Sequence, residues 1–363
     1  MAEYSYAIIG ASRISEQHIE AARMAGITLK AICDLTPENI QRVLAGSSLS
    51  DAEKQSVAVC GDYHHLLKNS GVDFITIATD SGSHARIALD CIAAGFHVLI
   101  EKPIALSLKD ADAVIEAAEK KNVMVAVSLQ NRFNPAVRQL KSAIEAGDFG
   151  QLLHGCAHIR WNRNEEYFTS ASWRGTWAAD GGTLFNQCIH NIDILRWVMG
   201  SEIDEVFAYT DRLAHPYIET DDMGLGLLKM KNGAYGFIEG TINVYPKNLE
   251  ETLYVFGMTG TAKLTGPSVS KIAEWNVKDA DGEETVLAYE KLAQPARGEK
   301  HRPLYENFAA ALAGRESIFV DAKAGRDAIE VIFAMLLSSK LKKPVKLPLS
   351  DLATIDFAGM YEK

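Results

Sequence analysis

Long hydrophobic runs, basic tracts and paired cysteines are all missing from this 363-residue chain. No apolar stretch approaches the roughly 20 residues that a membrane-spanning helix needs, and the chain runs from Met1 almost directly into a predicted strand. We therefore expect neither a membrane segment nor a signal peptide. The formal net charge is −10, which argues against nucleic acid or an anionic membrane as a partner. A small anionic ligand stays compatible with this balance, because a few local Arg or Lys side chains can override the overall sign.

Cysteine is also scarce, and its pattern excludes a disulfide framework. The five cysteines are scattered, odd in number and never arranged as CxxC. Most lie in apolar surroundings, as reduced thiols of a cytoplasmic protein do. No cluster of ligands has metal spacing, so no metal is expected. The length predicts two domains, and the 47% hydrophobic and 23% charged residues are ordinary for a globular protein.

The first 34 residues have the pattern of a dinucleotide-binding unit. A short apolar strand ends at Gly10, a turn leads into a helix, and a second strand, 29–33, ends at Asp34. The expected G-x-G-x-x-G reads Gly10, Ser12 and Ser15, so only the first glycine is present. Serine is small enough for fairly close approach to a pyrophosphate, although it adopts positive φ less freely.

Asp34 lies where an acidic side chain accepts hydrogen bonds from the adenosine ribose and repels a 2′-phosphate. Its position favours NAD over NADP. The alternative is that Asp34 caps the helix predicted over 37–43, and the two roles are compatible.

Strands and helices continue to alternate as far as residue 128. Strands that are apolar throughout are buried on both faces, which predicts a doubly wound parallel sheet and an NAD-binding Rossmann domain over 1–128. The residues expected to contact the cofactor lie in the first turn and at strand ends: Gly10, Ser12, Arg13, Ile14, Asp34, Thr79, His84, Glu101 and Lys102.

One strand end carries unusual chemistry. The apolar run 98–100 stops at Glu101-Lys102-Pro103, and the carboxyl ends of parallel strands are where open α/β sheets bind ligands. Burial and nearby charges can shift the pKa of such a lysine towards neutrality and make it useful for proton transfer. The plainer interpretation is a surface lysine paired with Glu101.

Residues 129–363 predict an α+β domain with an open, mainly antiparallel sheet. Alternating strands run from 205 to 256, and turns lie at 231–233 and 259–260. One face of this sheet is apolar, so we expect helices or another subunit to cover it, as in a homodimer or homotetramer. Segment 284–299 is polar and is expected to be a loop. The two helices predicted between 304 and 341 are expected to pack back on the first domain.

A loop rich in tryptophan and arginine precedes the next site motif. It contains Arg163 and Arg174, and its tryptophans include Trp161, Trp173 and Trp177. Sugar faces stack on tryptophan, and phosphates or carboxylates accept paired hydrogen bonds from arginine. The two arginines are therefore candidate substrate-binding residues. The alternative is a loop pinned by tryptophan at an oligomer interface.

Asn186, His190 and Asp193 follow at i, i+4 and i+7 of a predicted helix, so they share one face. A polar stripe with a central histidine is typical of a general base or a proton relay. Metal binding and a buried structural histidine are the alternatives.

Taken together, these motifs resemble the glucose–fructose oxidoreductase/inositol dehydrogenase (Gfo/Idh/MocA) family over essentially the whole chain. The resemblance implies a nicotinamide-dependent enzyme that oxidises a hydroxyl of a sugar or cyclitol. It also implies that Lys102 touches the reacting hydroxyl and that His190 is the acid/base. The family often has aspartate where this chain has Asn186, so an orienting role is expected for that residue.

Three stretches are similar to a narrower branch that oxidises C3 of UDP-N-acetylglucosamine or its uronic acid: 130–135, 173–177, and 180–182 followed by Asn186. The branch resemblance implies a nucleotide-sugar substrate, which contacts Lys102, Arg163, Arg174, Asn186 and His190. The alternatives are an inositol or free-sugar dehydrogenase, a glycosidase that uses NAD transiently, and a non-catalytic NAD-binding sensor.

Overall fold

The computed structural model describes residues 4–200, 202–278, 281–290 and 296–362. The chain forms two compact units, and each is assembled from separate stretches. The first unit comprises Met1–Ala105, Asp110–Gln130 and Gln294–Arg326. The second comprises Leu106–Lys109, Asn131–Ala293 and Asp327–Lys363. The chain thus passes from one unit to the other more than once. The domain boundary predicted at residue 128 corresponds to only one of these crossings, the one at residues 130–131.

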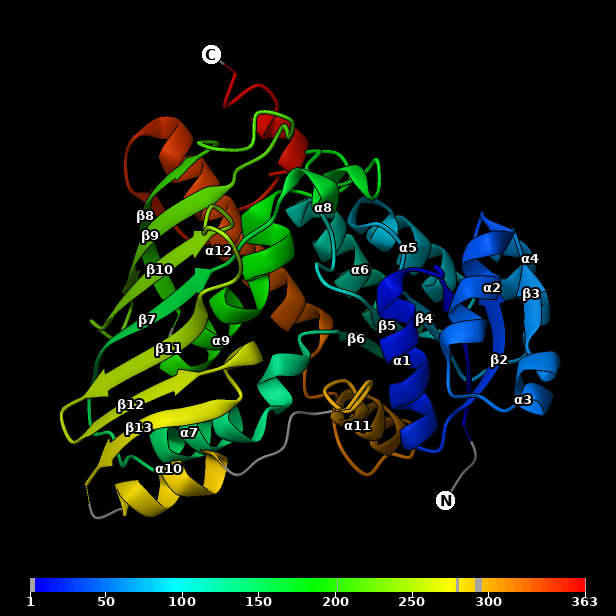
Figure 1. The fold of residues 1–363 in the computed structure, drawn as a ribbon, viewed down its shortest axis with the longest axis horizontal. Coiled ribbons are helices and arrows are strands. Elements are labelled where there is room, and N and C mark those ends of the chain that lie inside the picture. Colours follow the sequence, from blue (N-terminus) through cyan, green and yellow to red (C-terminus); the bar gives the residue numbers. More distant parts are fainter. Residues whose placement is uncertain (1–3, 201, 279–280, 291–295, 363) are drawn as a thin grey trace. The chain divides into compact units, whose positions relative to one another are not determined.

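The first unit is built on a parallel sheet in the order β3-β2-β1-β4-β5-β6, which is the dinucleotide-binding order (Figure 1). The order reverses between β1 and β4, where Ile8 pairs with Ile32 on one side and Thr76 on the other. The predicted Rossmann fold is confirmed. The strands are β1 (Ser5–Ile9), β2 (Thr28–Cys33), β3 (Ala58–Cys60), β4 (Phe74–Ile77), β5 (His97–Ile100) and β6 (Val125–Val127).

Helices connect these strands, and one helix from late in the chain completes the unit. The connecting helices are α1 (Arg13–Met24), α2 (Pro37–Gly46), α3 (Asp51–Ser56), α4 (Tyr63–Asn69), α5 (His84–Ala93) and α6 (Leu108–Lys121). The late helix is α11 (Arg302–Leu312), whose Tyr305 ring lies 5.9 Å from that of Tyr6. Its Phe308 ring lies 4.8 Å from that of Phe74. Because all four rings are fully buried, α11 is part of this core.

The second unit contains an eight-stranded sheet in the order β13-β12-β11-β7-β10-β9-β8-β14. Neighbouring strands are antiparallel except β7 and β10, which run parallel. The predicted open, mainly antiparallel sheet is thereby confirmed. Its strands are β7 (Leu152–Arg160), β8 (Ile203–Asp211), β9 (Met223–Met230), β10 (Tyr235–Thr241), β11 (Glu250–Gly257), β12 (Gly260–Thr265), β13 (Lys271–Val277) and β14 (Val345–Lys346).

The helices of this unit differ from the sequence analysis in two places. Segment Gly282–Glu290 forms helix α10 rather than a loop, and residues 291–295 of the expected loop lie outside the described residues. Helix α12 (Ala322–Leu341) belongs to the second unit from Asp327 onward, not to the first. The reason is packing, since its Ser338 accepts a hydrogen bond from the Ala208 amide of β8 and its Phe333 contacts Phe185. The other helices are α7 (Pro135–Glu145), α8 (Glu165–Thr169) and α9 (Ile189–Met199).

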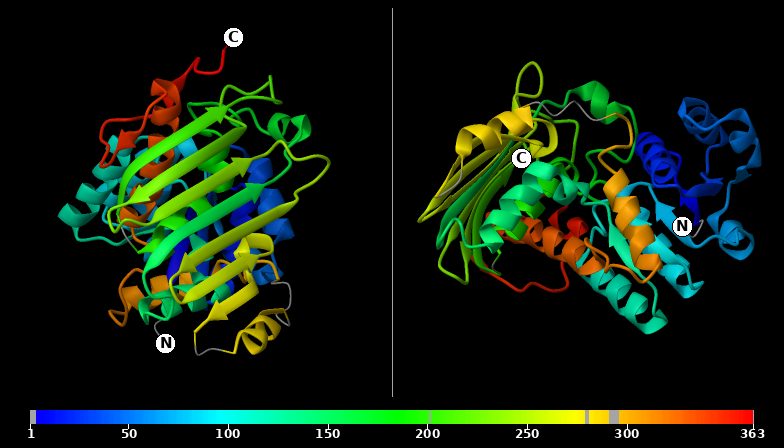
Figure 2. Two further views of the ribbon diagram at one scale, coloured as in Figure 1. Left: turned by 90° about the vertical axis from the view of Figure 1, so that its left-hand side faces the viewer. Right: turned by 90° about the horizontal axis from the view of Figure 1, so that it is seen from below.

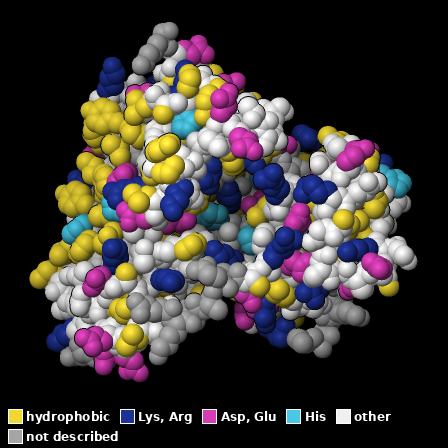
Figure 3. All heavy atoms as spheres, in the orientation of Figure 1, with side chains coloured by type: hydrophobic (Ala, Val, Ile, Leu, Met, Phe, Trp, Pro, Cys, Tyr) yellow, Lys and Arg dark blue, Asp and Glu magenta, His cyan; other side chains and the backbone are white. Residues whose placement is uncertain are grey.

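One face of the eight-stranded sheet is covered by α9 and α12, and the other is open (Figure 2, left). Along β9 the residues alternate between buried and exposed, and the exposed set includes Leu225 and Leu227. Tyr209 pairs with Leu225 across β8 and β9 and is 59% exposed. Hydrophobic side chains therefore gather on this side of the molecule (yellow at the left of Figure 3).

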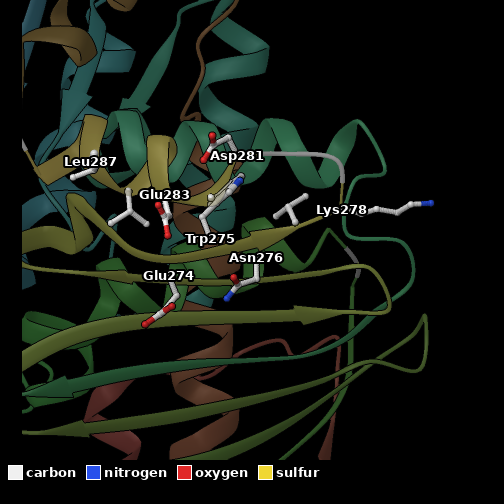
Figure 4. A pocket seen from close by; sticks show the side chains of 10 residues that line it. Glu274, Trp275, Asn276, Lys278, Asp281, Glu283 and Leu287 are labelled. Carbon is white, nitrogen blue, oxygen red and sulfur yellow. The ribbon is translucent and has the colours of Figure 1, made fainter.

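A surface pocket of about 740 Å³ lies between β13 and α10 (Figure 4). Among the lining residues that the structure describes, Glu274, Asp281 and Glu283 carry carboxylates and only Lys278 carries a positive charge. This excess of negative charge disfavours an anionic ligand, and none of the predicted site residues lines the pocket. Among the helices that the structure describes, none is long and apolar enough to cross a membrane.

Candidate active site

The turn after β1 fits a dinucleotide pyrophosphate. Gly10 has φ +100°, and a Cβ atom there would lie 2.5 Å from the backbone of Ala78, so only glycine permits this close passage against the end of β4. Ser12 donates its hydroxyl proton to the Ala78 carbonyl at 2.9 Å, and Ser15 donates to the Gly10 carbonyl at 2.8 Å. The two serines thus replace the missing glycines with hydrogen bonds that fix the turn. Helix α1 begins here, and first-turn amides such as those of Arg13 and Ile14 have no carbonyl partner within the helix, so they suit an anion. Their contact with a cofactor stays a prediction.

The Asp34 carboxylate lies at the end of β2, beside the same turn. One oxygen accepts the Ala11 amide at 2.7 Å and the other accepts the Thr36 amide at 2.8 Å. Thr36 is the N-cap of α2, so the alternative in which Asp34 caps that helix is wrong. The backbone thus holds the carboxylate half-buried. The oxygen that accepts the Thr36 amide also lies 3.4 Å from the side-chain amide of Asn39, whereas the oxygen that accepts the Ala11 amide keeps a lone pair for a ribose hydroxyl.

Replacing Asp34 with asparagine should relax the cofactor preference. The side chain keeps its size but loses the charge that repels a 2′-phosphate, and Arg42, which donates to the Ala11 carbonyl at 2.8 Å, is close enough to attract one. We expect the ratio of kcat/KM with NADP to that with NAD to rise by roughly 100-fold. The matched control is Asp62→Asn, which changes an N-cap of α4 in the same domain. An unchanged ratio in Asp34→Asn would contradict the role of this carboxylate.

Thr79 and His84 follow β4. His84 is 1% exposed, and its Nδ1 lies 2.8 Å from the Pro103 carbonyl while its Nε2 lies 3.3 Å from the Thr79 carbonyl. Burial lowers the pKa of His84, which favours a neutral ring that donates from Nδ1. The histidine therefore supports the backbone next to Lys102, and its direct contact with a cofactor stays a prediction.

Glu101 is a buried carboxylate that fixes the backbone of Lys102. One oxygen lies 2.9 Å from Nε2 of His18, and the other accepts the Lys102 amide at 3.2 Å. Although burial raises the pKa of Glu101, the hydrogen bond and charge of His18 outweigh burial and hold the pKa well below its usual range. Glu101 is therefore an ionised, structural partner, and the pairing of Lys102 with Glu101 as a surface feature is wrong because Glu101 is only 6% exposed. Lys102 itself is half-buried.

Further hydrogen bonds extend this network into the core. Nδ1 of His18 lies 3.0 Å from the Tyr305 hydroxyl, which lies 3.1 Å from the Thr76 hydroxyl. Nε2 of His301 lies 3.9 Å from the Glu101 oxygen that contacts His18, and its ring lies 5.1 Å from that of His18. Burial together with His18 lowers the pKa of His301 to about 3. The ligand atoms of His18, Glu101 and His301 lie within 4.8 Å of one another, a spacing that a metal ion can bridge. Because His18 already contacts Glu101 directly, we interpret the cluster as a hydrogen-bonded structural group.

In the second unit, Arg163 and Arg174 flank one aromatic ring. Their guanidinium carbons lie 5.1 and 4.2 Å from the centroid of Tyr167, and each also stacks on a tryptophan, Trp161 or Trp173. No carboxylate lies within 4.0 Å of either guanidinium in the part of the chain that the structure describes. Two neighbouring positive charges of this kind attract an anion, and the binding of a substrate by these two arginines stays a prediction.

Asn186 and His190 lie on a helix with an irregular start. Segment Leu184–Cys188 forms a π-helical turn before α9, and both side chains are half-buried. Gly182 precedes the turn with φ +103°, and a Cβ atom there would lie 2.2 Å from the Asp221 carboxylate. The glycine therefore permits the chain to enter the helix beside a buried acid. Single π turns are frequent at functional sites.

Asp193, the third member of the predicted polar stripe, is not part of this site. It is completely buried and accepts two hydrogen bonds from Arg132, one of them 2.7 Å long. Arg132 also lies 5.2 Å from the ring of Trp197. Asp193 thus anchors α9 to the segment after β6, and a buried paired charge of this kind is structural.

Asp180 is a site residue for which the sequence predicted no role, although it belongs to the motif at 180–182. Its buried carboxylate accepts the Gly175 amide at 2.7 Å and also the side-chain amide of Asn186. No periodicity relates residue 180 to residue 186, since the chain between them is not a regular helix. The signal that could have found Asp180 is the pair of glycines directly after it.

Two protein-family models match this chain. A model described as the oxidoreductase family, NAD-binding Rossmann fold, matches residues 4–129. A second model, described as the GFO/IDH/MocA C-terminal domain, matches residues 137–263.

Several relatives are similar over most of their length. The crystal structure of the WlbA dehydrogenase from Bordetella pertussis in complex with NADH and UDP-GlcNAcA has a TM-score of 0.87 and 31% identity, over 96% of this chain and 99% of that chain. The WlbA dehydrogenase from Chromobacterium violaceum, in complex with the same two ligands, has a TM-score of 0.86 and 29% identity, over 96% and 97%. Myo-inositol 2-dehydrogenase from Thermotoga maritima is 28% identical over 260 residues, which is 70% of this chain and 72% of that protein.

Proposed function

Because the chain belongs to the GFO/IDH/MocA oxidoreductase family and is an NAD-dependent sugar dehydrogenase, we propose a class of substrate for it. This class is the nucleotide sugars. The substrate we propose is a UDP-N-acetylhexosamine or its uronate, oxidised at the C3 hydroxyl. The observation that carries this proposal is the pair of guanidiniums of Arg163 and Arg174, which lie 5.1 and 4.2 Å from the ring centroid of Tyr167. Similarity to two dehydrogenases solved with UDP-GlcNAcA supports it.

The negative charge of the proposed substrate matches the two positive charges of Arg163 and Arg174. The diphosphate of a UDP-sugar is anionic, and a uronate adds a carboxylate. Neither Arg163 nor Arg174 has a carboxylate partner among the residues described, so an incoming anion has no internal one to displace. An uncharged cyclitol would leave both guanidiniums without a counter-charge.

We assign the chemical roles to Lys102, His190 and Asn186. Lys102 donates a charged hydrogen bond to the reacting hydroxyl and so lowers the free energy of the alkoxide that forms. His190 accepts the hydroxyl proton at a ring nitrogen. Asn186 orients the groups around this proton transfer. When bound, NAD accepts the hydride from the carbon that carries the hydroxyl.

The substrate assignment is tested by absorbance at the NADH band after the protein is mixed with NAD and a panel of sugars. The panel contains UDP-N-acetylglucosamine, its uronate, free sugars and myo-inositol. We expect NADH only with a UDP-sugar, and in Arg174→Gln we expect KM for that sugar to rise by about 10- to 100-fold with a smaller change in kcat. NADH formation with myo-inositol alone would contradict the proposal and support the second candidate, an inositol dehydrogenase, which the 28% identical Thermotoga maritima enzyme favours.

The open face of the second-domain sheet supports association with another copy of this chain. Tyr209, Leu225, Leu227 and Tyr235 are 59, 37, 56 and 57% exposed, and they lie on three adjacent strands. A self-complementary apolar face of this kind forms the two-fold interface of a homodimer or homotetramer.

The five free thiols fit a reducing compartment such as the cytoplasm.

Leu227→Glu should convert the oligomer into a smaller species. A carboxylate in the middle of the apolar face stays charged and is costly to bury at an interface. Light scattering coupled to size-exclusion chromatography should show a lower mass for Leu227→Glu, and the parent mass for the control Leu35→Glu, which changes a 90% exposed leucine of the first unit. A parent protein that is already monomeric would contradict association through this face.

A further inference from the structure

The hydrogen bond to Asp180 fixes the orientation of the Asn186 side-chain amide. A carboxylate oxygen is an acceptor, so the group of Asn186 that faces Asp180 is the NH₂ and not the carbonyl oxygen. The other oxygen of Asp180 accepts the Gly175 amide at 2.7 Å, so both carboxylate oxygens are held by N–H groups. The side chain of Asn186 therefore cannot rotate by 180° without placing its carbonyl oxygen against a carboxylate.

The surroundings of Asp180 are acidic. Three carboxyl groups lie close together, from Asp180, Asp221 and Asp222. Burial raises the pKa of Asp221 to about 8, and the charges of Asp222 and Asp180 raise it further in the same direction. Despite burial, the hydrogen bond from His215 lowers the pKa of Asp222 to about 2. Burial thus favours the protonated form of Asp221, while the carboxylate of Asp180 accepts N–H groups from Gly175 and Asn186.

We propose that Asp180 is a positioning residue that orients the Asn186 amide so that its carbonyl oxygen, and not its NH₂ group, meets the reacting hydroxyl and His190. This inference rests on the roles proposed above for Asn186 and His190. An oxygen at this place accepts a hydrogen bond from the hydroxyl or from the protonated ring of His190, as an aspartate would. Asn186 thus supplies a hydrogen-bond acceptor next to the reacting hydroxyl. The negative charge lies on Asp180, which contacts Asn186 and not the hydroxyl.

The same carboxylate also fixes the arginine loop. Gly175 has φ +71°, and a Cβ atom there would lie 2.6 Å from Ile218, so the loop has little freedom at this residue. Because Gly175 follows Arg174 directly, Asp180 ties together the backbone next to the anion-binding arginine and the side chain next to His190.

Exchanging the two side chains tests the inference. In Asp180→Asn the new amide keeps its oxygen on the Gly175 N–H and therefore turns its NH₂ towards Asn186. The Asn186 side chain must then turn its carbonyl oxygen towards residue 180 and present NH₂ to the site instead. Asn186→Asp places two carboxylates in contact, and one of them must take up a proton. We expect kcat to fall by about 10- to 100-fold in each single variant, with KM for NAD unchanged. The double variant Asp180→Asn/Asn186→Asp again pairs one amide with one carboxylate, and we expect its kcat to return to within about fivefold of the parent.

Each result supports or overturns the inference. Recovery of kcat in the double variant supports it, whereas a double variant as slow as the slower single variant overturns it, as does a parent-like kcat in Asp180→Asn. Thermal melting of all four proteins identifies a variant that fails to fold, and if Asp180→Asn does so, the comparison of Asn186→Asp with the double variant decides. The rates are measured with whichever sugar of the panel reduces NAD, so a wrong nucleotide-sugar assignment does not affect the comparison.

Discussion

Lys102→Ala should lower kcat by about 1,000-fold while the protein still binds NAD with nearly parent affinity. The substitution removes the one ammonium group that follows β5, where the Glu101 carboxylate and the Pro103 backbone hold the chain in place. Those two supports do not involve the lysine side chain, so the strand end and the cofactor turn at Gly10 should be unchanged. The measurement is steady-state turnover of the sugar substrate, together with NADH binding followed by fluorescence.

Two further variants separate the charge of Lys102 from its shape. Lys102→Arg keeps the positive charge but spreads it over a planar group, so it should recover only a small part of the lost turnover. Lys68→Ala removes an exposed lysine of α4 and should leave turnover unchanged. Turnover near the parent value in Lys102→Ala would exclude this lysine from the reaction.

His190→Gln should cost about 100- to 10,000-fold in kcat, because glutamine cannot accept the proton of the hydroxyl. The pH profile should change in a defined direction. A histidine that acts as the base must be neutral, so kcat of the parent falls as the pH drops and the ring becomes protonated. This acidic limb should be absent in His190→Gln, which has no group that titrates at this position. The measurement is kcat as a function of pH at saturating sugar and NAD.

Combining the two substitutions shows whether Lys102 and His190 act on the same hydroxyl. If they do, the double variant should lose less than the product of the two single losses, because either change alone already disrupts the same proton transfer. His65→Gln, an exposed histidine on α4, serves as the control and should keep the parent profile. Fully multiplicative losses, or an acidic limb that persists in His190→Gln, would contradict the assignment.

The first domain could be predicted almost entirely from local sequence. The strand, turn, helix, strand and acid that end at Asp34 need no distant partner, and apolar strands that alternate with helices define a parallel sheet. The structure adds the detail that Ser12 and Ser15 fix the turn by hydrogen bonds. Lys102 was conspicuous for the same reason, since a charged pair directly after a buried strand is a local signal.

Side chains joined across long distances in the sequence could not be predicted. Periodicity placed Asp193 on the same stripe as His190, but Asp193 pairs with Arg132, which lies 61 positions earlier. The link from Asp180 to Asn186 depends on the chain path through two glycines with positive φ and a π-helical turn, and helical periodicity describes neither feature. Helix α10 was missed because its segment is polar, and α12 was misplaced because residue patterns do not show which sheet a buried helix face meets.

The position of α11 in the first core has a consequence for how this protein is synthesised. The ribosome completes the six strands of the cofactor domain by residue 127, but the rings that cover Tyr6 and Phe74 belong to Tyr305 and Phe308. At 5–20 residues per second, these aromatic rings follow the last strand only after roughly 9–36 s. During that interval the nascent sheet keeps an uncovered apolar surface, and His18 lacks the Tyr305 hydroxyl that binds it. A fragment that ends at residue 130 would keep this defect permanently, so an isolated cofactor domain must carry residues 296–326 grafted onto it.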